Sequence, residues 1–200
     1  MILSENTKHN IHKAHFVNGV APDKYLVKYR NIFELLQYRA QLLPDDIFIT
    51  FYPDSGDKIT LRYSEFAALV YKTANLLKSK GIIPGDRIAA VSHNHINTVI
   101  QYYAAWALGA TVVPINVSEE PDRIEYILKS SKTKLAFIKN EYYNKFSEVL
   151  NRLNIQIIVH SADLGRAESA VSIYENELKD QNNAFVPDDS VDQETESLIV

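Results

Sequence analysis

Apolar residues recur along most of the chain at spacings that distinguish helices from strands. The first organised segment begins at Asn31, whose side chain can cap a helix, and ends near Pro44. Its apolar residues stand three or four positions apart, on one helical face: Ile32, Leu35, Leu36 and Ala40. Residues 47–52 and 58–62 then flank a Pro-Asp-Ser-Gly turn, and this arrangement predicts a β-hairpin.

A second amphipathic helix is predicted after Ser64, a residue that suits the N-cap position. Its apolar stripe consists of Phe66, Leu69, Val70, Ala74 and Leu77. Gly81 can take the left-handed conformation that ends a helix. A Pro-Gly-Asp turn at 84–86 leads to residues 88–91, an apolar run without alternation that is typical of a strand buried on both faces.

The alternation of helix and strand continues to about residue 159. Helices are predicted over residues 96–108, 119–130 and 142–150, and strands over residues 111–115, 135–138 and 155–159. Successive strands begin roughly 20 to 24 residues apart, which suits a right-handed parallel crossover through a helix and is too much for a hairpin. The pattern predicts an α/β fold: a doubly wound, mostly parallel sheet flanked by helices on both faces, with the small β-hairpin before it.

The two ends of the chain follow a different pattern. Residues 1–30 are polar without a clear period, which predicts an irregular N-terminal arm ahead of the α/β subdomain at 31–160. Residues 161–200 are acidic and rich in amides, which predicts a loop with one short helix near 172–179. The chain then reads Ser-Leu-Ile-Val at 197–200, the start of a further strand, so a truncated chain is expected.

Composition excludes several classes of partner and site. A net charge of −4 provides no basic field for phosphates, so neither nucleic acid nor an anionic membrane is expected as a partner. The absence of cysteine excludes disulfides, thiolate zinc sites and a thiol nucleophile. The sequence contains neither the apolar core of a signal peptide at its start nor a run of about 20 apolar residues that could span a membrane. A cytoplasmic protein is therefore expected.

The clearest candidate for chemistry is the turn after the strand at 88–91. His93, Asn94 and His95 follow the carboxyl end of that strand, where open parallel sheets bind their ligands. Two positions of separation do not place two imidazoles on one helical face, and no acidic residue follows before Glu119. This spacing favours helix capping or ordinary turn chemistry over a metal or catalytic role. The six glycines form neither GxGxxG nor GxxxxGK[ST], so no known nucleotide-binding loop is present.

Three longer segments carry a resemblance to a known family. They are ITLRYSEFAALVYKTANLLKSKGIIPGDRIAAVSHN at 59–94, YYAAWALGATVVPIN at 102–116 and RIEYILKSSKTKLAFI at 123–138. In this order and at these separations they resemble the AMP-forming adenylating enzymes, which include acyl-CoA and aryl-CoA synthetases, the adenylation domains of peptide synthetases and firefly luciferase. The resemblance extends from about residue 31 to residue 159.

The resemblance implies a ligase that uses ATP and Mg²⁺ to convert a carboxylic acid into an acyl-adenylate, with loss of pyrophosphate. The acyl group then passes to the thiol of CoA or of a carrier protein. The family's Ser/Thr/Gly-rich phosphate loop and its catalytic lysine have no counterpart here, and residues 197–200 stand where the family's strand leads into that loop. The expectation is the N-terminal part of an acyl-CoA synthetase of the kind found in fatty acid metabolism. Alone it is expected to be inactive, with no catalytic residue and no bound cofactor.

The resemblance also implies a role for four residues. Where the family has Pro-Asn-Ser, this chain has His93-Asn94-His95, so only Asn94 matches. These three residues and Asn116 are expected to line the edge of the acyl or CoA channel. An asparagine at 116 is closer to CoA ligases than to amino-acid adenylation domains, which more often have aspartate there. Two alternatives remain: an adenylation domain or acyl-AMP ligase that loads a carrier protein, and a non-catalytic α/β binding module complete at residue 200.

Overall fold

The computed structural model describes residues 4–14, 16, 20, 28–54, 56–161 and 172–199. Residue 55 of the predicted hairpin turn, residues 162–171 of the predicted loop and residue 200 of the predicted strand lie outside these ranges. The chain divides into two compact units, Met1–Arg30 and Asn31–Val200. Within the described ranges, every helix is too short or too polar to cross a membrane.

The first unit contains a helix that the sequence pattern did not predict. Helix α1, Glu5–Ala14, replaces part of the expected irregular arm. The Ser4 hydroxyl accepts the backbone N–H of Thr7 at 3.1 Å, and Lys8 pairs with Glu5 at 2.7 Å. These local contacts stabilise a helix without an apolar face. Because α1 buries no residue, it has no apolar period from which it could have been predicted.

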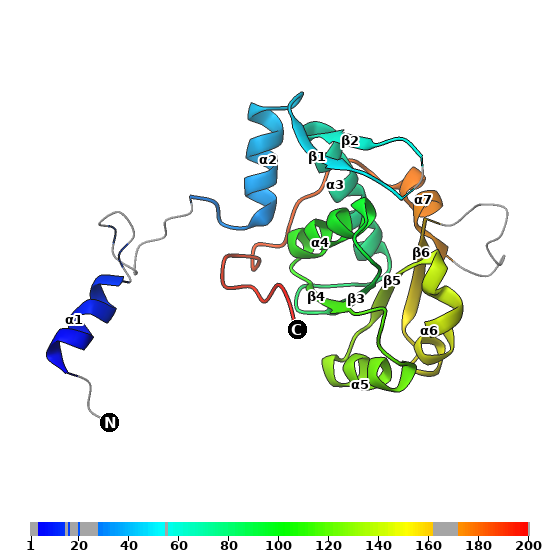
Figure 1. Ribbon diagram of the computed structural model, residues 1–200. Coiled ribbons are helices and arrows are strands. Elements are labelled where there is room, and N and C mark those ends of the chain that lie inside the picture. Colours follow the sequence, from blue (N-terminus) through cyan, green and yellow to red (C-terminus); the bar gives the residue numbers. More distant parts are fainter. Residues whose placement is uncertain are drawn as a thin grey trace. The chain divides into compact units, whose positions relative to one another are not determined.

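The second unit begins with a helix, a hairpin and a longer helix (Figure 1): α2 Ile32–Leu42, β1 Ile47–Phe51, β2 Ile59–Arg62 and α3 Tyr63–Ser79. As predicted, Asn31 caps α2, and its side chain accepts the N–H of Glu34 at 3.0 Å. The prediction for Ser64 was wrong. Its hydroxyl donates to the carbonyl of Pro44 at 2.8 Å, and the carboxylate of Glu65 accepts the N–H of Arg62 at 2.8 Å.

The central sheet confirms the doubly wound α/β prediction. It comprises β3 Arg87–Val91, β4 Thr111–Ile115, β5 Leu135–Lys139, β6 Gln156–His160 and β7 Ser172–Ile173. The strands lie in the order β4-β3-β5-β6-β7, and every neighbouring pair is parallel. The helices between them are α4 Ile96–Leu108, α5 Pro121–Ser131 and α6 Asn140–Arg152.

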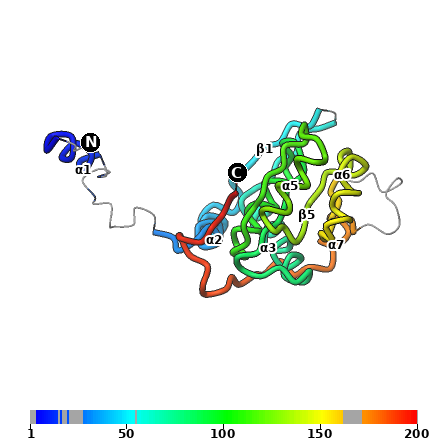
Figure 2. Tube along the Cα trace, turned by 90° about the horizontal axis from the view of Figure 1, so that it is seen from below, coloured from blue at the N-terminus to red at the C-terminus, as the bar shows by residue number. Residues whose placement is uncertain are grey.

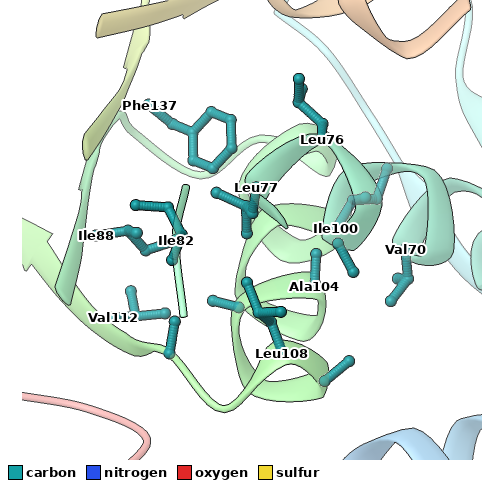
Figure 3. Close-up of a cluster of buried hydrophobic side chains, with 14 of the residues drawn as sticks. Val70, Leu76, Leu77, Ile82, Ile88, Ile100, Ala104, Leu108, Val112 and Phe137 are labelled. Atoms are coloured by element: carbon teal, nitrogen blue, oxygen red, sulfur yellow. The ribbon is translucent and has the colours of Figure 1, made fainter. Parts of the chain in front are cut away.

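Each face of the sheet packs against its own helices (Figures 1 and 2). Ile88, Val112 and Phe137 point into the core that α2, α3 and α4 cover, and Figure 3 shows them beside Leu77 and Leu108. The intervening positions Ala89, Val91, Val113, Ala136 and Ile138 point into the second core, under α5 and α6. Because both faces are buried, the strands are continuously apolar, as the sequence suggested.

The C-terminal part continues the sheet and then crosses the first helical layer. The short helix predicted near 172–179 is resolved into β7, helix α7 Tyr174–Glu177 and the 3₁₀ turn η1 Leu178–Asp180. Residues 182–199, here called the C-terminal strap, then run back towards β4. The side chain of Asn75 donates to the carbonyls of Asn182 and Ala184, both at 2.9 Å. These bonds attach the start of the strap to α3.

The far end of the C-terminal strap reaches the edge of β4. The indole of Trp106 donates to the carbonyl of Ser197 at 2.8 Å. Leu198 forms a parallel bridge with Val112, and two backbone hydrogen bonds of 3.0 Å flank that bridge. The strand predicted at 197–200 is thus present as one bridge beside β4.

Candidate functional site

The strand connections diverge at the carboxyl ends of the neighbouring strands β3 and β5. The connection that follows β3 passes through α4 over one face, whereas the connection that follows β5 passes through α6 over the other. Two neighbouring strands whose connections diverge leave a crevice at their carboxyl ends, which is where open α/β sheets bind ligands. Residues 92–95, the turn that the sequence singled out, directly follow β3 at this position.

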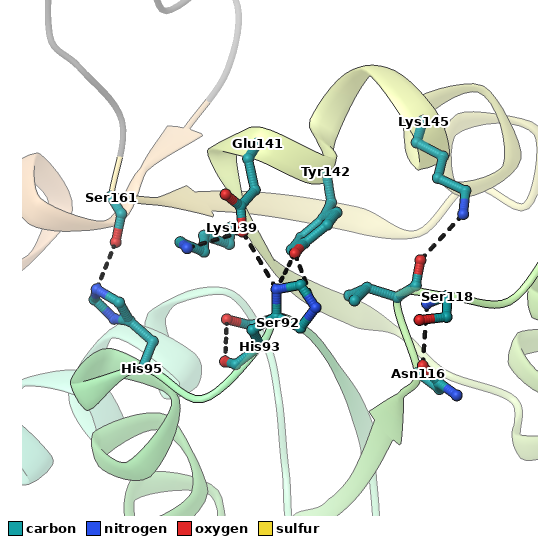
Figure 4. Close-up of polar contacts among 11 residues, drawn as sticks. Ser92, His93, His95, Asn116, Ser118, Lys139, Glu141, Tyr142, Lys145 and Ser161 are labelled. Carbon is teal, nitrogen blue, oxygen red and sulfur yellow. Dashed lines mark hydrogen bonds and ion pairs between the residues drawn. The ribbon is translucent and has the colours of Figure 1, made fainter. Parts of the chain in front are cut away.

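His93 crosses the crevice to contact α6 (Figure 4). The hydroxyl of Tyr142 lies within hydrogen-bond distance of both ring nitrogens, and Nδ1 lies 3.6 Å from the carboxylate of Glu141. Lys139 holds that carboxylate at 2.8 Å and lowers the pKa of Glu141. Burial and the neighbouring Glu141 raise the pKa of Tyr142 to about 12, so its hydroxyl keeps its proton. His93 therefore joins the end of β3 to α6.

His95 points away from His93 and caps α4. Its Nδ1 accepts the N–H of Asn97 at 3.1 Å, so in the neutral ring the proton is on Nε2. Nε2 lies 3.2 Å from the hydroxyl oxygen of Ser161 and donates to it. The ring also contacts Phe51 and His160, with centroid distances of 5.1 and 5.4 Å. The structure thus assigns His95 the capping role that the spacing favoured.

The Ser161–His95 pair does not form an activated nucleophile. A general base must accept the serine proton, but Nε2 of His95 already carries one because Nδ1 is an acceptor. The other nitrogen near Ser161 is Nδ1 of His160, at 3.2 Å. Burial lowers the pKa of His160 to about 3, which makes that ring a weak base. Ser161 and its histidines therefore hold the structure together.

Asn94 lines a pocket of about 460 Å³ at the carboxyl ends of β3 and β4. The pocket is lined by Asp54, Ser92, His93, Asn94, Ile115, Asn116 and Val117. The side-chain oxygen of Asn116 accepts the N–H of Ser118 at 3.0 Å, which leaves its amide hydrogens for other partners. Three of the four predicted site residues thus line one pocket. His95 is not among the lining residues, because its ring faces Ser161.

Several residues of this region were not predicted from the sequence. Lys139 and Ser161 lie at the carboxyl ends of β5 and β6, so applying the strand-end rule to every strand would have identified them. Asp54 comes from the hairpin, and nothing in the sequence relates it to β3. Among the described residues, no three His, Asp or Glu side chains converge as metal ligands.

Comparison with known proteins gives the region a family context. A family model described as AMP-binding enzyme matches residues 36–198. The 3-hydroxybenzoate–CoA ligase of Aromatoleum sp. (strain CIB) is 28% identical over 109 residues, which cover 54% of this chain and 21% of that protein. Tyrocidine synthase 1 of Brevibacillus parabrevis is 26% identical over 155 residues, which cover 78% of this chain and 12% of that protein.

A solved structure agrees with the fold. The anthranilate CoA ligase AuaEII, in complex with anthranoyl-AMP, superposes with a TM-score of 0.73 at 17% identity, covering 85% of this chain and 32% of that one. The chain therefore spans about a fifth or less of the length of these two curated relatives, and about a third of this structural neighbour.

Proposed function

Because this chain belongs to the AMP-binding enzyme family, we propose that it is the N-terminal part of an ATP-dependent acid–thiol ligase. In the proposed reaction a carboxylate oxygen attacks the α-phosphorus of ATP, and pyrophosphate leaves with Mg²⁺. A thiolate then attacks the acyl carbon and AMP leaves, which yields the thioester. The observation that carries the proposal is the family match over residues 36–198.

The proposed role of the pocket is the edge of the channel that receives the acyl group or CoA. Asn94 and Asn116 supply amide groups, and Ile115 and Val117 supply apolar surface. Asp54 adds a carboxylate, so the lining suits an uncharged chain with both hydrogen-bonding and apolar groups better than an anionic one. His93 supports this edge from the α6 side, and His95 acts from behind it by holding the turn in place.

ATP, Mg²⁺ and CoA belong to the whole enzyme in this proposal. We place the phosphate-binding groups in the part of the relatives that this chain does not cover. Residues 1–200 alone are accordingly proposed to be inactive. A fatty or other organic acid as substrate, a role in fatty acid metabolism and a cytoplasmic location form part of the same proposal.

A carrier protein, in place of CoA, is the second candidate for the thiol that accepts the acyl group. The match to tyrocidine synthase 1 covers 78% of this chain, against 54% for the match to 3-hydroxybenzoate–CoA ligase. This longer match favours a peptide-synthetase-like adenylation domain, or an acyl-AMP ligase that loads a carrier. A non-catalytic α/β binding module is the remaining alternative.

Pyrophosphate release tests the proposal. The longest protein that the gene encodes is screened against carboxylic acids, with CoA, with a carrier protein and with neither. Acid-dependent release is expected, and thioester formation identifies the acceptor. Pyrophosphate release that does not depend on any acid would refute the proposed ligase activity. Acid-dependent pyrophosphate release by residues 1–200 alone would refute the proposal that the phosphate-binding groups lie outside this chain.

Two variants test the pocket. Asn94→Ala and Asn116→Ala are expected to raise the KM for acid or thiol several-fold and to leave the KM for ATP unchanged, because only the channel edge is altered. Asn144→Ala is the matched control, since Asn144 is exposed on α6 and away from the pocket lining. Equal effects of the three variants would exclude the pocket as a channel edge.

A further inference from the structure

The turn that carries Asn94 is held on both sides by histidines. His93 contacts α6 through Tyr142, and His95 contacts the end of β6 through Ser161 (Figure 4). Asn94 lies between them and lines the pocket. The position of this side chain therefore depends on whether both histidine contacts are kept.

The contact on the β6 side is a directional chain of hydrogen bonds. Nδ1 of His95 accepts the N–H of Asn97, so Nε2 is the protonated nitrogen and donates to Ser161. The single hydroxyl proton of Ser161 is then free to reach Nδ1 of His160. Every position in the chain requires both imidazoles to be neutral.

An added proton would break one of these hydrogen bonds. On His95 it can bind only to Nδ1, the atom that accepts the N–H of Asn97, and the cap of α4 is then lost. On His160 the Ser161 contact uses Nδ1, and a proton there would face the serine proton. The other nitrogen, Nε2, is buried without a partner among the described residues, and the whole side chain is 0% exposed.

The charges near the two rings act in opposite directions. Among the described residues, Lys139 at the end of β5 lowers the pKa of both histidines, and Glu141 at the start of α6 raises it to a smaller extent. The described part of the hairpin contributes the uncharged ring of Phe51. Glu175 of α7 accepts the N–H of Ser161 at 2.7 Å and the side-chain amide of Asn97 at 3.1 Å. Glu175 therefore keeps β6 and α4 joined by bonds that involve no histidine.

Ser161 is also held in a backbone conformation that serine seldom adopts. Its φ is 56°, in the left-handed region, which is unfavourable for a residue with a side chain. The contacts with His95, His160 and Glu175 offset this cost. Loss of the two histidine contacts would leave Glu175 alone to hold the strained residue.

We propose that His95, Ser161 and His160 form a proton-sensitive clasp, in which protonation of the histidines releases the cap of α4 and frees the turn that carries Asn94. The clasp is a property of the folded chain and does not depend on the proposed ligase activity. It would make the shape of the pocket depend on pH in a range where the rest of the fold is intact.

The direction and size of the effect follow from linkage. Burial, and then the charges of His95 and Lys139, lower the pKa of His160 to about 3, against 6.5 for an unperturbed histidine. The clasp is therefore fully held above about pH 6.5, and it weakens as the pH falls, because only the released form takes up the proton. Between pH 7.5 and pH 5.0 the released population is expected to rise by up to about 30-fold, the value for a His160 that regains its unperturbed pKa on release.

Amide hydrogen exchange measured by NMR tests the clasp. The protection factor of the Asn97 amide, corrected for intrinsic exchange, is expected to fall by up to about 30-fold from pH 7.5 to pH 5.0. The amide of Ala104, in the buried middle of α4, is expected to keep its protection. Unchanged protection of Asn97, or an equal fall at both amides, would overturn the proposal.

Two further measurements separate the clasp from a general effect of acid. His160→Asn keeps an acceptor for the Ser161 hydroxyl and cannot take up a proton, so the fall at Asn97 should become smaller, and the part that remains is due to His95 itself. The exposed His12 provides the control: His12→Asn should retain the full fall. If His160→Asn does not fold, ¹⁵N shifts of the wild-type imidazoles decide, since a proton on Nδ1 of His95 at pH 7.5 would refute the hydrogen-bond chain.

Discussion

The C-terminal strap lies so close to Gly109 that a single methyl group should displace it. Gly109 ends α4 with φ 81°, and a Cβ built there would lie 2.6 Å from Cγ2 of Val191 and 3.2 Å from Cβ of Pro84. Val191 is 1% exposed, and its carbonyl accepts the side-chain amide of Asn31 at 2.9 Å. Gly109→Ala therefore forces a buried residue of the strap to move.

The magnitude has two parts. A left-handed backbone conformation at a residue with a side chain lowers the free energy of unfolding by about 1 kcal/mol. Overpacking against a buried neighbour adds roughly 1 to 3 kcal/mol. Gly109→Ala is therefore expected to lower the free energy of unfolding by about 2 to 4 kcal/mol. The assay is urea unfolding followed by circular dichroism.

Gly81 provides a matched control for the conformational part. It follows α3 with φ 80°, and a Cβ there would have nothing within 4 Å, so Gly81→Ala should lower stability by only about 1 kcal/mol. In the double variant Gly109→Ala/Val191→Ala the clash is relieved. The loss should therefore be smaller than the sum of the two single losses by about 1 to 3 kcal/mol.

Two outcomes would refute this reasoning. Equal losses for Gly109→Ala and Gly81→Ala would mean that the added methyl group meets nothing at position 109. Additive losses in the double variant would mean that Val191 does not pack on Gly109, and the C-terminal strap would then not be seated on the end of α4.

Three further substitutions test buried polar groups and the strap. Gln101 is 1% exposed, and both polar atoms of its side-chain amide lack a hydrogen-bond partner among the described residues. Gln101→Leu should therefore raise the free energy of unfolding by about 1 to 3 kcal/mol. A decrease would mean that the amide does have a hydrogen-bond partner. Thr73→Val should lower the free energy of unfolding by about 1 to 3 kcal/mol, because the hydroxyl of Tyr174, 2.6 Å from that of Thr73, is left unpaired. Adding Tyr174→Phe to this variant should then change stability little. A further loss of about 1 to 3 kcal/mol would contradict the pairing. Trp106→Phe removes the bond to Ser197 and should speed proteolytic cleavage within the strap, and an unchanged rate would argue against that attachment.

The regular part of the fold could be predicted from sequence because its signals are local. Residues 96–108 were predicted as a helix and residues 111–115 as a strand, and the structure has the same bounds. The periodicity of buried positions within each element is enough for this. Helix α1 was missed because it buries nothing, and the cap at Ser64 was misassigned because Pro44, its partner, is distant in sequence.

The candidate site could be predicted only as a location. The strand-end rule placed the region at residues 93–95, and the pocket includes His93, Asn94 and Asn116. The directions of the two histidine rings did not follow from their spacing. His93 and His95 are two residues apart, yet one ring contacts Tyr142 and the other contacts Ser161.

The sequence by itself thus determined the order of helices and strands over residues 31–160 and the parallel sheet, and the resemblance of three segments in order indicated the family. The elements and the sheet depend on patterns that repeat within about 30 residues, the length of one strand-helix-strand unit. Only the tertiary structure decided which side chains meet at the carboxyl ends of β3, β5 and β6. Those strands are neighbours in the sheet but not all consecutive in the chain, so the partners of His93 and His95 depend on strand order, which periodicity does not encode.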